Sequence, residues 1–183
     1  MSLPRPWTVV ETREVQDCDV FRLQETLARS PYGGDAHRFW RIDAAAWVNV
    51  VPVTSAGEIV MVRQWRHGSR DVTLEIPGGI VDPGETPLSA AARELREETG
   101  YGGGELSAIG EVNPNPALFA NRVHTYCARG VERVGEIEND DREETVVELV
   151  PLAELDRRLR SGEIRHALVV AALHWFRLLE RGA

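Results

Sequence analysis

The chain has 183 residues, of which 43% are hydrophobic and 27% are charged, so it can form one soluble globular domain. A net charge of −8 without a basic stripe argues against nucleic-acid binding. No apolar run of about 18 residues, no apolar N-terminal segment and only two cysteines, Cys18 and Cys127, are found. We therefore expect no membrane span, no secretory signal and no disulfide framework, and a cytoplasmic protein with reduced thiols.

The N-terminal half alternates β-like segments with turn residues. Strands are predicted within 7–29 and at 38–43, with a turn cluster between them. Two apolar runs flank Ser55-Ala56-Gly57, which predicts a β-hairpin over 47–65. Residues 74–76 are predicted to be extended, and the glycine-rich segment that follows is predicted to be a loop as far as residue 86.

The C-terminal half contains the predicted helices. Thr86 followed by Pro87 is typical of a helix N-terminus and Gly100 of its end, so a helix is predicted over 87–99. Further segments are predicted in chain order: strands near 106–113, 122–128 and 145–150, then helices at 151–160 and 164–180. The last helix has an apolar stripe at helical spacing, typical of a buried face: Ile164, Leu168, Val169, Ala172, Leu173, Phe176 and Leu179.

The first predicted helix has one apolar and one acidic side. The apolar positions predict the buried stripe: Leu88, Ala91, Ala92 and Leu95. On the other side Glu94, Glu97 and Glu98 lie about one turn apart, where their charges repel one another. Hard divalent cations with oxygen ligands would relieve this repulsion, whereas a solvated acidic face is the alternative. Gly78 and Gly79 ahead of the helix would let a ligand or metal approach the backbone.

The residues around this helix resemble a known motif. From Gly79 the sequence has five residues, Glu85, seven residues and then Arg93-Glu94-Leu95-Arg96-Glu97-Glu98-Thr99-Gly100-Tyr101. This resembles the Nudix box, Gly-x5-Glu-x7-Arg-Glu-U-x-Glu-Glu-x-Gly-U, where U is a bulky aliphatic residue. Only Tyr101 departs from the pattern, and it is still large and mainly apolar. The resemblance implies an α+β fold, an α/β/α sandwich with a mixed β-sheet and an N-terminal antiparallel β extension.

The resemblance also implies a domain organisation and a metal site. We expect a single domain over 1–183, with an N-terminal β region up to about residue 45 and a catalytic core from there on. In the family, positions like those of Glu94 and Glu98 bind magnesium. The position of Glu97 assists or binds a further ion, and the backbone carbonyl near Gly78 completes the site. Mg²⁺ is therefore expected, with Mn²⁺ able to substitute.

The two other charged residues that the box fixes, Glu85 and Arg93, are expected to support the loop and helix by ion pairing. Such a pair would act on the shape of the site and would take no direct part in the chemistry.

Segments outside the box resemble the branch of ADP-ribose pyrophosphatases and nucleoside-diphosphate-sugar hydrolases. There an arginine like Arg66 grips the diphosphate, and a residue like Glu75 lies beside the substrate or metal. Pro116 is similar to a proline marker of ADP-ribose pyrophosphatases. Asn115 and Asn121 are candidates for hydrogen bonds to a ribose or sugar. The alternatives are an ordinary surface arginine and asparagines that cap turns.

An aromatic residue and an acidic segment complete the predicted site. Trp40 resembles an aromatic that stacks on the nucleobase in this branch, often across a dimer interface, so a homodimer is expected. A tryptophan packed in the core is the alternative. The general base is expected in the acidic segment 136–144, with Glu143 favoured over Glu144, although most acidic runs are solvated loops. His124, in a predicted strand, is expected to be structural.

The leading hypothesis is a metal-dependent pyrophosphohydrolase. It would cleave ADP-ribose or a nucleoside diphosphate sugar to a nucleoside monophosphate and a sugar phosphate, with that small nucleotide as its partner. The alternatives are a Nudix hydrolase of a nucleoside triphosphate or dinucleotide, and a nucleotide-sensing or protein-binding domain without catalysis. The intact acidic box favours an enzyme. A purely structural acidic helix leaves the spacing of Gly79 and Glu85 unexplained.

Overall fold

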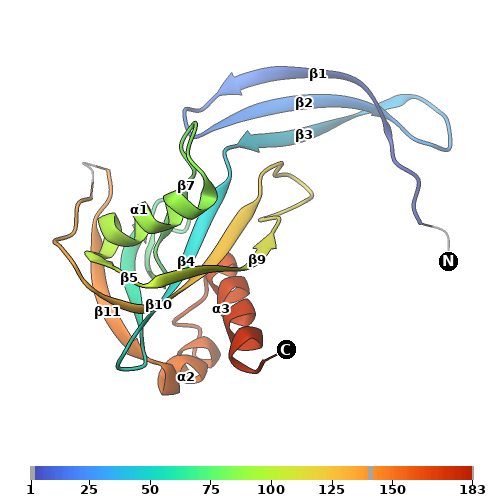
Figure 1. The fold of residues 1–183 in the computed structure, drawn as a ribbon. Helices are drawn as coiled ribbons and strands as arrows, with labels where there is room; N and C mark the ends of the chain where they lie inside the picture. Colours follow the sequence, from blue (N-terminus) through green and yellow to red (C-terminus); the bar gives the residue numbers. More distant parts are fainter. Residues whose placement is uncertain (1–2, 140–141, 183) are drawn as a thin grey trace. The chain divides into compact units, whose positions relative to one another are not determined.

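The computed structural model describes residues 3–139 and 142–182. The chain divides into two compact units (Figure 1). The first consists of Met1–Ala45 and Asn113–Arg122, and the second of Ala46–Val112 and Val123–Ala183. Among the described residues no helix is both long enough and apolar enough to cross a membrane.

The first unit contains a three-stranded antiparallel sheet in the order β1-β2-β3. Its strands are β1 (Thr8–Asp17), β2 (Phe21–Arg29) and β3 (Ala36–Ala44). Trp7 packs its ring edge-to-face on His37 and Phe39 of β3, which fixes the start of β1 against the opposite edge of the sheet. The predicted N-terminal antiparallel extension is confirmed, with strands longer than the sequence pattern indicated.

A segment from the second half of the chain completes this unit. The Ile42 N–H donates to the Leu118 carbonyl at 2.8 Å, and the Ala120 N–H donates to the Ile42 carbonyl at 3.0 Å. Ile42 and Phe119 thereby form an isolated parallel bridge. Residues 113–122 therefore belong to the first unit although they connect two strands of the second.

The second unit is built on a mixed eight-stranded sheet with the central order β11-β5-β4-β10-β8. β6 pairs with β5, β7 with β4, and β9 with β10; among the described strands of this sheet, β4 and β10 form the one parallel pair. The strands are β4 (Trp47–Thr54), β5 (Glu58–Arg66), β6 (Asp71–Glu75), β7 (Gly78–Ile80), β8 (Tyr101–Gly102), β9 (Glu105–Val112), β10 (Val123–Arg133) and β11 (Thr145–Pro151).

Two predictions for this sheet need correction. The hairpin predicted over 47–65 has a single register pair, Val53 with Ile59, because β4 then pairs with β7 and β10 while β5 pairs with β6 and β11. Residues 78–80, predicted to be a loop, form β7 against β4. A Cβ on Gly78 would lie 2.2 Å from the Val48 carbonyl oxygen, so only glycine allows this approach of the two strands.

Within the described residues the α-helices are α1 (Pro87–Thr99), α2 (Leu155–Arg160) and α3 (Ala167–Glu180). α1 has the predicted bounds and the predicted caps. Thr86 Oγ1 accepts from the Ser89 N–H, and Gly100 ends the helix at a φ of 71°. The helix predicted at 151–160 begins as the 3₁₀ turn Leu152–Glu154, and the helix predicted at 164–180 starts three residues later.

The buried face of α1 differs from the predicted stripe. Leu88 and Ala92 are exposed, whereas Ala91 and Leu95 are buried as predicted. Ala90 and Glu98 are buried as well. The helix is thus rotated so that one edge of its acidic side packs against the sheet, and this rotation buries a carboxyl group.

Hydrophobic clusters lie on both faces of the sheet, as the predicted α/β/α sandwich requires. One cluster joins β4 and β5 to α3 through residues such as Met61, Leu173 and Phe176. The other joins β4 and β10 to α1 through residues such as Val50 and Leu95. Since side chains alternate along a strand, Val50 and Val51 of β4 fall into different clusters. Figure 1 shows α1 and α3 beside β4 and β10.

Candidate active site

The acidic residues of α1 line a hollow of about 390 Å³ in the second unit. Glu94, Glu97 and Glu98 lie there with Gly79 of β7. Glu143, from the acidic segment before β11, lines the same hollow. The hollow is therefore lined by segments far apart in the sequence, and most of its polar side chains are carboxylates.

Glu98 is the most buried of these carboxyls, with 4% of its surface exposed. Burial raises the pKa of Glu98 to about 8; the Gly78 N–H, donating to Oε2 at 2.9 Å, opposes the rise. The neighbouring charges of Glu94 and Glu143 raise the pKa further. The charge of Arg66 also opposes the rise, but together with the Gly78 hydrogen bond it does not outweigh the burial.

Glu94 occupies the space above Gly79. Burial raises the pKa of Glu94, against the opposing charge and hydrogen bond of Arg93. A Cβ on Gly79 would lie 2.3 Å from Oε1 of Glu94 and 2.5 Å from its Cδ. Glycine at this position is therefore a condition for the location of the Glu94 carboxylate.

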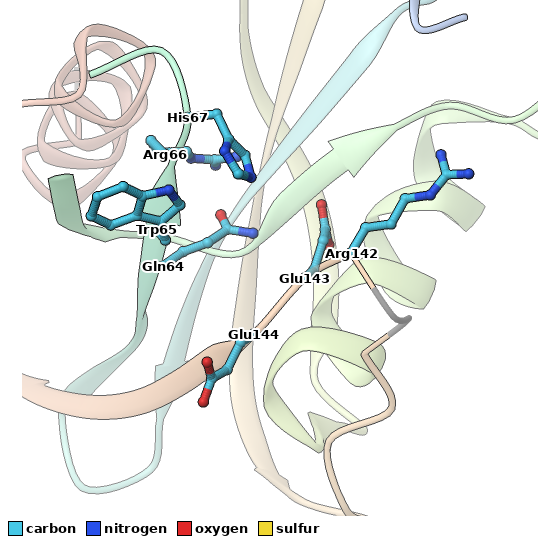
Figure 2. Close-up of a pocket in the computed structure, with 7 residues that line it drawn as sticks. All are labelled: Gln64, Trp65, Arg66, His67, Arg142, Glu143 and Glu144. Atoms are coloured by element: carbon cyan, nitrogen blue, oxygen red, sulfur yellow. The ribbon is translucent and has the colours of Figure 1, made fainter. Parts of the chain in front are cut away.

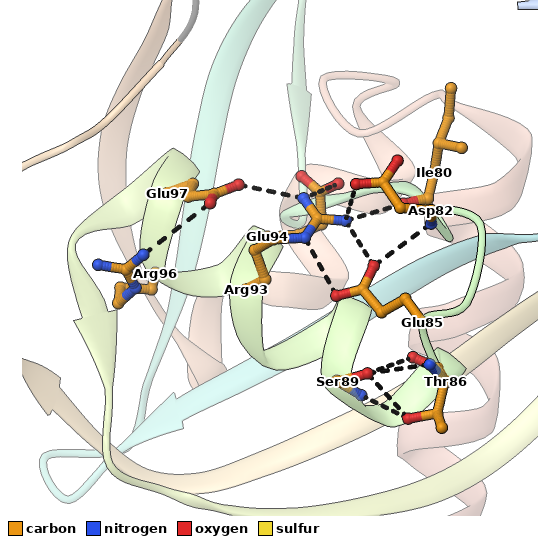
Figure 3. A network of polar contacts seen from close by, with 9 residues as sticks. All are labelled: Ile80, Asp82, Glu85, Thr86, Ser89, Arg93, Glu94, Arg96 and Glu97. Carbon is orange, nitrogen blue, oxygen red and sulfur yellow. Dashed lines mark hydrogen bonds and ion pairs between the residues drawn. The ribbon is translucent and has the colours of Figure 1, made fainter.

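Arg93 links the loop before α1 to the helix itself (Figure 3). It donates to Glu85 from Nε at 3.2 Å and from Nη2 at 2.9 Å, and Nη2 also donates to the Ile80 carbonyl at 3.0 Å. Its Nη1 donates to Oε1 of Glu94 at 2.9 Å and to Oε2 of Glu97 at 3.1 Å. The structure thus contains the expected ion pair between Arg93 and Glu85.

The donor set of this hollow fits a hard divalent cation. Carboxylate and carbonyl oxygens are the ligands that Mg²⁺ and Ca²⁺ prefer. Arg93 donates to Oε1 of Glu94 and the Gly78 N–H to Oε2 of Glu98, which leaves the second oxygen of each carboxylate for a cation. No group of three acidic, histidine or cysteine side chains within those ranges already has ligand geometry. Arg93 also donates to Oε2 of Glu97.

The acidic segment is attached to the end of α1. The Glu138 N–H donates to the Glu97 carbonyl at 2.8 Å, and the Thr145 hydroxyl donates to the Glu98 carbonyl at 2.8 Å. Asn139 bonds back to Thr145. These contacts bring Glu143 to the hollow. Asp140 and Asp141 of the predicted segment lie outside the described residues.

A second hollow, of about 430 Å³, adjoins the first through Glu143, which lines both. It is lined by residues at the end of β5, among them Gln64 and Arg66, and by the chain just before β11 (Figure 2). In Figure 2 the carboxylates of Glu143 and Glu144 point in different directions. Glu144 lines the second hollow but not the first.

Arg66 forms a two-pronged ion pair with Glu75 on β6. Nε donates to Oε1 at 2.9 Å and Nη2 to Oε2 at 2.8 Å. Glu75 is 2% exposed, and its Oε1 also accepts from the Thr73 hydroxyl at 2.5 Å. Burial raises the pKa of Glu75, but the hydrogen bonds and charge of Arg66 outweigh it, so the pKa is lowered. Both members of the pair are therefore charged.

Two polar residues near this pair were missed by the sequence analysis. Gln64 is 5% exposed and lines the second hollow, and its Oε1 has no hydrogen-bond partner among the described residues. Thr73 is equally buried. The available signal was strand periodicity, because Gln64 lies two residues before Arg66 and so shares its face of β5.

The remaining candidates lie in the first unit. Trp40 is 46% exposed and lines a hollow of about 460 Å³ with Pro116, so it is not packed in a core.

Asn115 Oδ1 accepts from the Ala117 N–H at 3.2 Å, which is the local turn predicted as the alternative. Asn121 is 6% exposed and donates to the Ala45 carbonyl at 2.9 Å. His124, in the second unit, pairs with Glu111.

The chain is similar in sequence and in fold to known proteins. A protein-family model described as the NUDIX domain matches residues 44–173. The ADP-ribose pyrophosphatase of Mycobacterium tuberculosis is 32% identical over 156 residues, which cover 84% of this chain and 75% of that protein. The ADP-ribose pyrophosphatase of Bacillus subtilis is 34% identical over 134 residues, covering 73% and 72%. A crystal structure of an ADP compounds hydrolase shares the fold, with a TM-score of 0.86 and 22% identity over 100% of this chain and 98% of that one.

Proposed function

The chain belongs to the Nudix family of hydrolases, and from this premise we propose that it is a divalent-metal-dependent pyrophosphohydrolase acting on ADP-ribose or nucleoside diphosphate sugars. The observation that carries the proposal is the pair of adjoining hollows in the second unit. One is lined by the acidic face of α1 and the other by Arg66, with Glu143 lining both. A cation site beside an arginine suits a diphosphate, which needs both kinds of positive charge.

The substrate class is supported by the relatives. Two bacterial proteins that this chain matches over more than two thirds of their length are named ADP-ribose pyrophosphatases. Hydrolysis of ADP-ribose adds one water across the P–O–P bridge and gives AMP and ribose 5-phosphate. A nucleoside diphosphate sugar would give a nucleoside monophosphate and a sugar phosphate in the same way.

The metal proposed is Mg²⁺, with Mn²⁺ able to replace it. Glu94, Glu97, Glu98 and the carbonyl of Gly78 are the residues that would hold it. When bound, the ion cancels diphosphate charge and acidifies a water molecule.

The remaining roles fall to this chain's own side chains. Glu143 accepts the proton of the attacking water, with Glu144 as the second candidate. Arg66, paired with Glu75, binds diphosphate oxygens. Trp40, whose hollow includes Pro116, stacks on the nucleobase, and Asn115 and Asn121 offer hydrogen bonds to the ribose or sugar.

The assembly proposed is a homodimer in the cytoplasm. Several large apolar side chains of the first unit are exposed, among them Trp7, Val9 and Phe39, which is unusual for a surface that stays in water. Two free cysteines, Cys18 and Cys127, suit a reducing compartment. Light scattering of the purified protein tests the dimer. A molar mass equal to that of the monomer at all concentrations would contradict it.

A substrate panel tests the proposal. ADP-ribose, several nucleoside diphosphate sugars, nucleoside triphosphates and a dinucleoside polyphosphate are incubated with the protein and Mg²⁺, and products are identified by mass spectrometry. We expect AMP and ribose 5-phosphate from ADP-ribose as the fastest reaction. Faster release of pyrophosphate from triphosphates would identify a triphosphate hydrolase instead. Binding without turnover of any compound would identify a sensor.

A further inference from the structure

We infer that Glu75 and Thr73 are positioning residues, which aim Arg66 at the diphosphate without touching substrate or metal. The inference rests on the proposed function for the identity of the ligand. It differs from a direct role for Glu75 beside the substrate, which the sequence resemblance suggests.

The first argument is the way Arg66 divides its hydrogen-bond donors. A guanidinium has five N–H groups in one plane. Nε and one N–H of Nη2 are used on Glu75, at 2.9 and 2.8 Å. The side chain is 38% exposed, while that of Glu75 is 2% exposed. One edge of the plane is therefore held inside the protein, and the other edge borders the hollow that Arg66 lines.

The second argument is that the oxygens of Glu75 are already engaged. Oε1 accepts from Arg66 and from the hydroxyl of Thr73, and Oε2 accepts from Arg66. The Nδ1 atom of His166 lies 4.0 Å from Oε2. A carboxylate surrounded in this way and almost fully buried has no free side toward a ligand. Its effect on a bound diphosphate must pass through Arg66.

The third argument comes from the strand register. Arg66 lies opposite Asp71 in the β5–β6 pair, whereas Glu75 lies opposite Val62, farther along the strands. The directly opposite carboxylate is the expected partner of Arg66. Asp71, however, forms an ion pair with Arg165, in the segment before α3. The Arg66 side chain therefore runs along the strand pair, away from Asp71 and toward Glu75. The ion pair with Glu75 fixes the direction of the guanidinium group.

Thr73 completes the arrangement by holding Glu75 in turn. Thr73 lies opposite Gln64, between the two ends of the ion pair, and is 5% exposed. Its hydroxyl donates to the same oxygen that accepts from Nε of Arg66. A fixed arginine loses little freedom when the diphosphate binds, so the arrangement favours tight binding.

A double-mutant cycle tests the inference. Glu75→Gln is made in the natural sequence and in Arg66→Ala. Three quantities are measured: the Kd of α,β-methylene-ADP, a non-hydrolysable diphosphate, by calorimetry, and the kcat and KM for ADP-ribose. We expect Glu75→Gln to weaken binding about tenfold when Arg66 is present and less than about twofold when it is absent. The cost should fall mainly on Kd and KM, and the Mg²⁺ concentration for half-maximal activity should not move.

Two conservative variants of Thr73 test the inference even if Glu75→Gln misfolds. Thr73→Val removes the hydroxyl and keeps the shape, whereas Thr73→Ser keeps the hydroxyl. We expect Thr73→Val to raise the Kd about threefold and Thr73→Ser to leave it near the natural value. Equal losses in these two variants would overturn the role of Thr73, because packing alone would then explain them.

The outcomes separate this inference from the proposed function. Additive losses in the cycle, or a shifted Mg²⁺ requirement in Glu75→Gln, would show direct contact with substrate or metal and overturn the inference. A natural protein that binds α,β-methylene-ADP yet hydrolyses no nucleoside diphosphate compound would contradict the proposed function alone.

Discussion

The Glu98 carboxylate accepts a hydrogen bond from the Gly78 N–H, a residue 20 positions earlier in the chain, at 2.9 Å. The bond ties the glycine-rich strand β7 to the last turn of α1. It also holds a carboxyl group in a position where only 4% of its surface is exposed. Burial favours the neutral carboxyl group of Glu98, whereas the proposed metal site needs its carboxylate, and this conflict can be measured.

The metal-free protein should lose stability as the pH rises. The pKa of Glu98 is raised to about 8 in the folded chain, from about 4.3 when unfolded, so the unfolded state loses this proton first. The stabilisation that the protonated Glu98 carboxyl gives to the folded state is complete below about pH 4 and disappears as the pH rises toward about 8. Melting in EDTA at about pH 5 and about pH 8.5 should show a drop at least ~5 °C larger in the natural protein than in Glu98→Gln. The exposed Glu144→Gln is the control, and equal drops in all three proteins would contradict the burial effect.

Turnover should need a divalent cation and the charge of Glu98. Chelation should abolish hydrolysis of ADP-ribose, and added Mg²⁺ or Mn²⁺ should restore it. Glu98→Gln keeps the volume but loses the charge that a hard cation requires, so kcat at saturating Mg²⁺ should fall by about 100-fold or more. Circular dichroism would check the fold. Full activity after thorough chelation would rule out the metal, and full activity of the variant would rule out Glu98 as a ligand.

Glu143 and Glu144 provide a matched pair for the search for the base. Both are exposed, but only Glu143 lines the two hollows together. Glu143→Gln should lower kcat by about tenfold or more, while Glu144→Gln should lower it less than about threefold. The measurement is kcat across a pH series. If neither variant loses more than threefold, the base lies elsewhere, with Glu97 the next candidate.

Gly79→Ala should displace Glu94. The added Cβ would lie 2.3 Å from Oε1 of Glu94, so the carboxylate or β7 has to move. We expect kcat to fall about tenfold or more and the Mg²⁺ requirement to increase. Gly68→Ala is the control, because a Cβ there meets nothing within 4 Å. A Gly79→Ala enzyme with normal Mg²⁺ dependence would mean that the location of Glu94 is not critical.

Trp40→Ala should weaken nucleotide binding without unfolding the protein. Its side chain is 46% exposed, so little core packing is lost. We expect KM to rise about tenfold for adenine and guanine substrates alike, because stacking on the face of a base does not distinguish the polar groups at its edge. Tyr32→Ala, in the same unit and 78% exposed, is the control and should leave KM unchanged. A large loss of melting temperature with normal KM would instead assign Trp40 to packing.

Local signals in the sequence predicted α1 and its surroundings well. Thr86, Pro87 and Gly100 fix the ends of the helix through caps that depend only on neighbouring residues. The spacing from Gly79 to Glu98 likewise lies within one short stretch. The rotation of the helix was harder to predict, since Ala92 and Ala90 are equally apolar and only the packing against the sheet decides which is buried.

Contacts between distant segments could not be predicted in the same way. β7 is too short and too rich in glycine for a strand pattern, and it forms because β4 offers a free edge. The ion pair between Arg66 and Glu75 depends on the β5–β6 register. It also depends on Arg165, which pairs with Asp71 and so removes it as a partner of Arg66. Strand periodicity places Gln64 on the same face of β5 as Arg66, but the burial of Gln64 depends on contacts with distant segments.

The backbone bonds between Ile42 and residues 118–120 have a consequence for how such a chain can change in evolution. A single genetic crossover near residue 45 between two relatives would join β3 of one parent to the 113–122 segment of the other. The chimera would then have to match side chains that were never selected together, although its parents share one fold. Substitutions around Ile42 and Phe119 should therefore be inherited in pairs, and exchange of the N-terminal unit needs a second exchange some 70 residues farther along the chain.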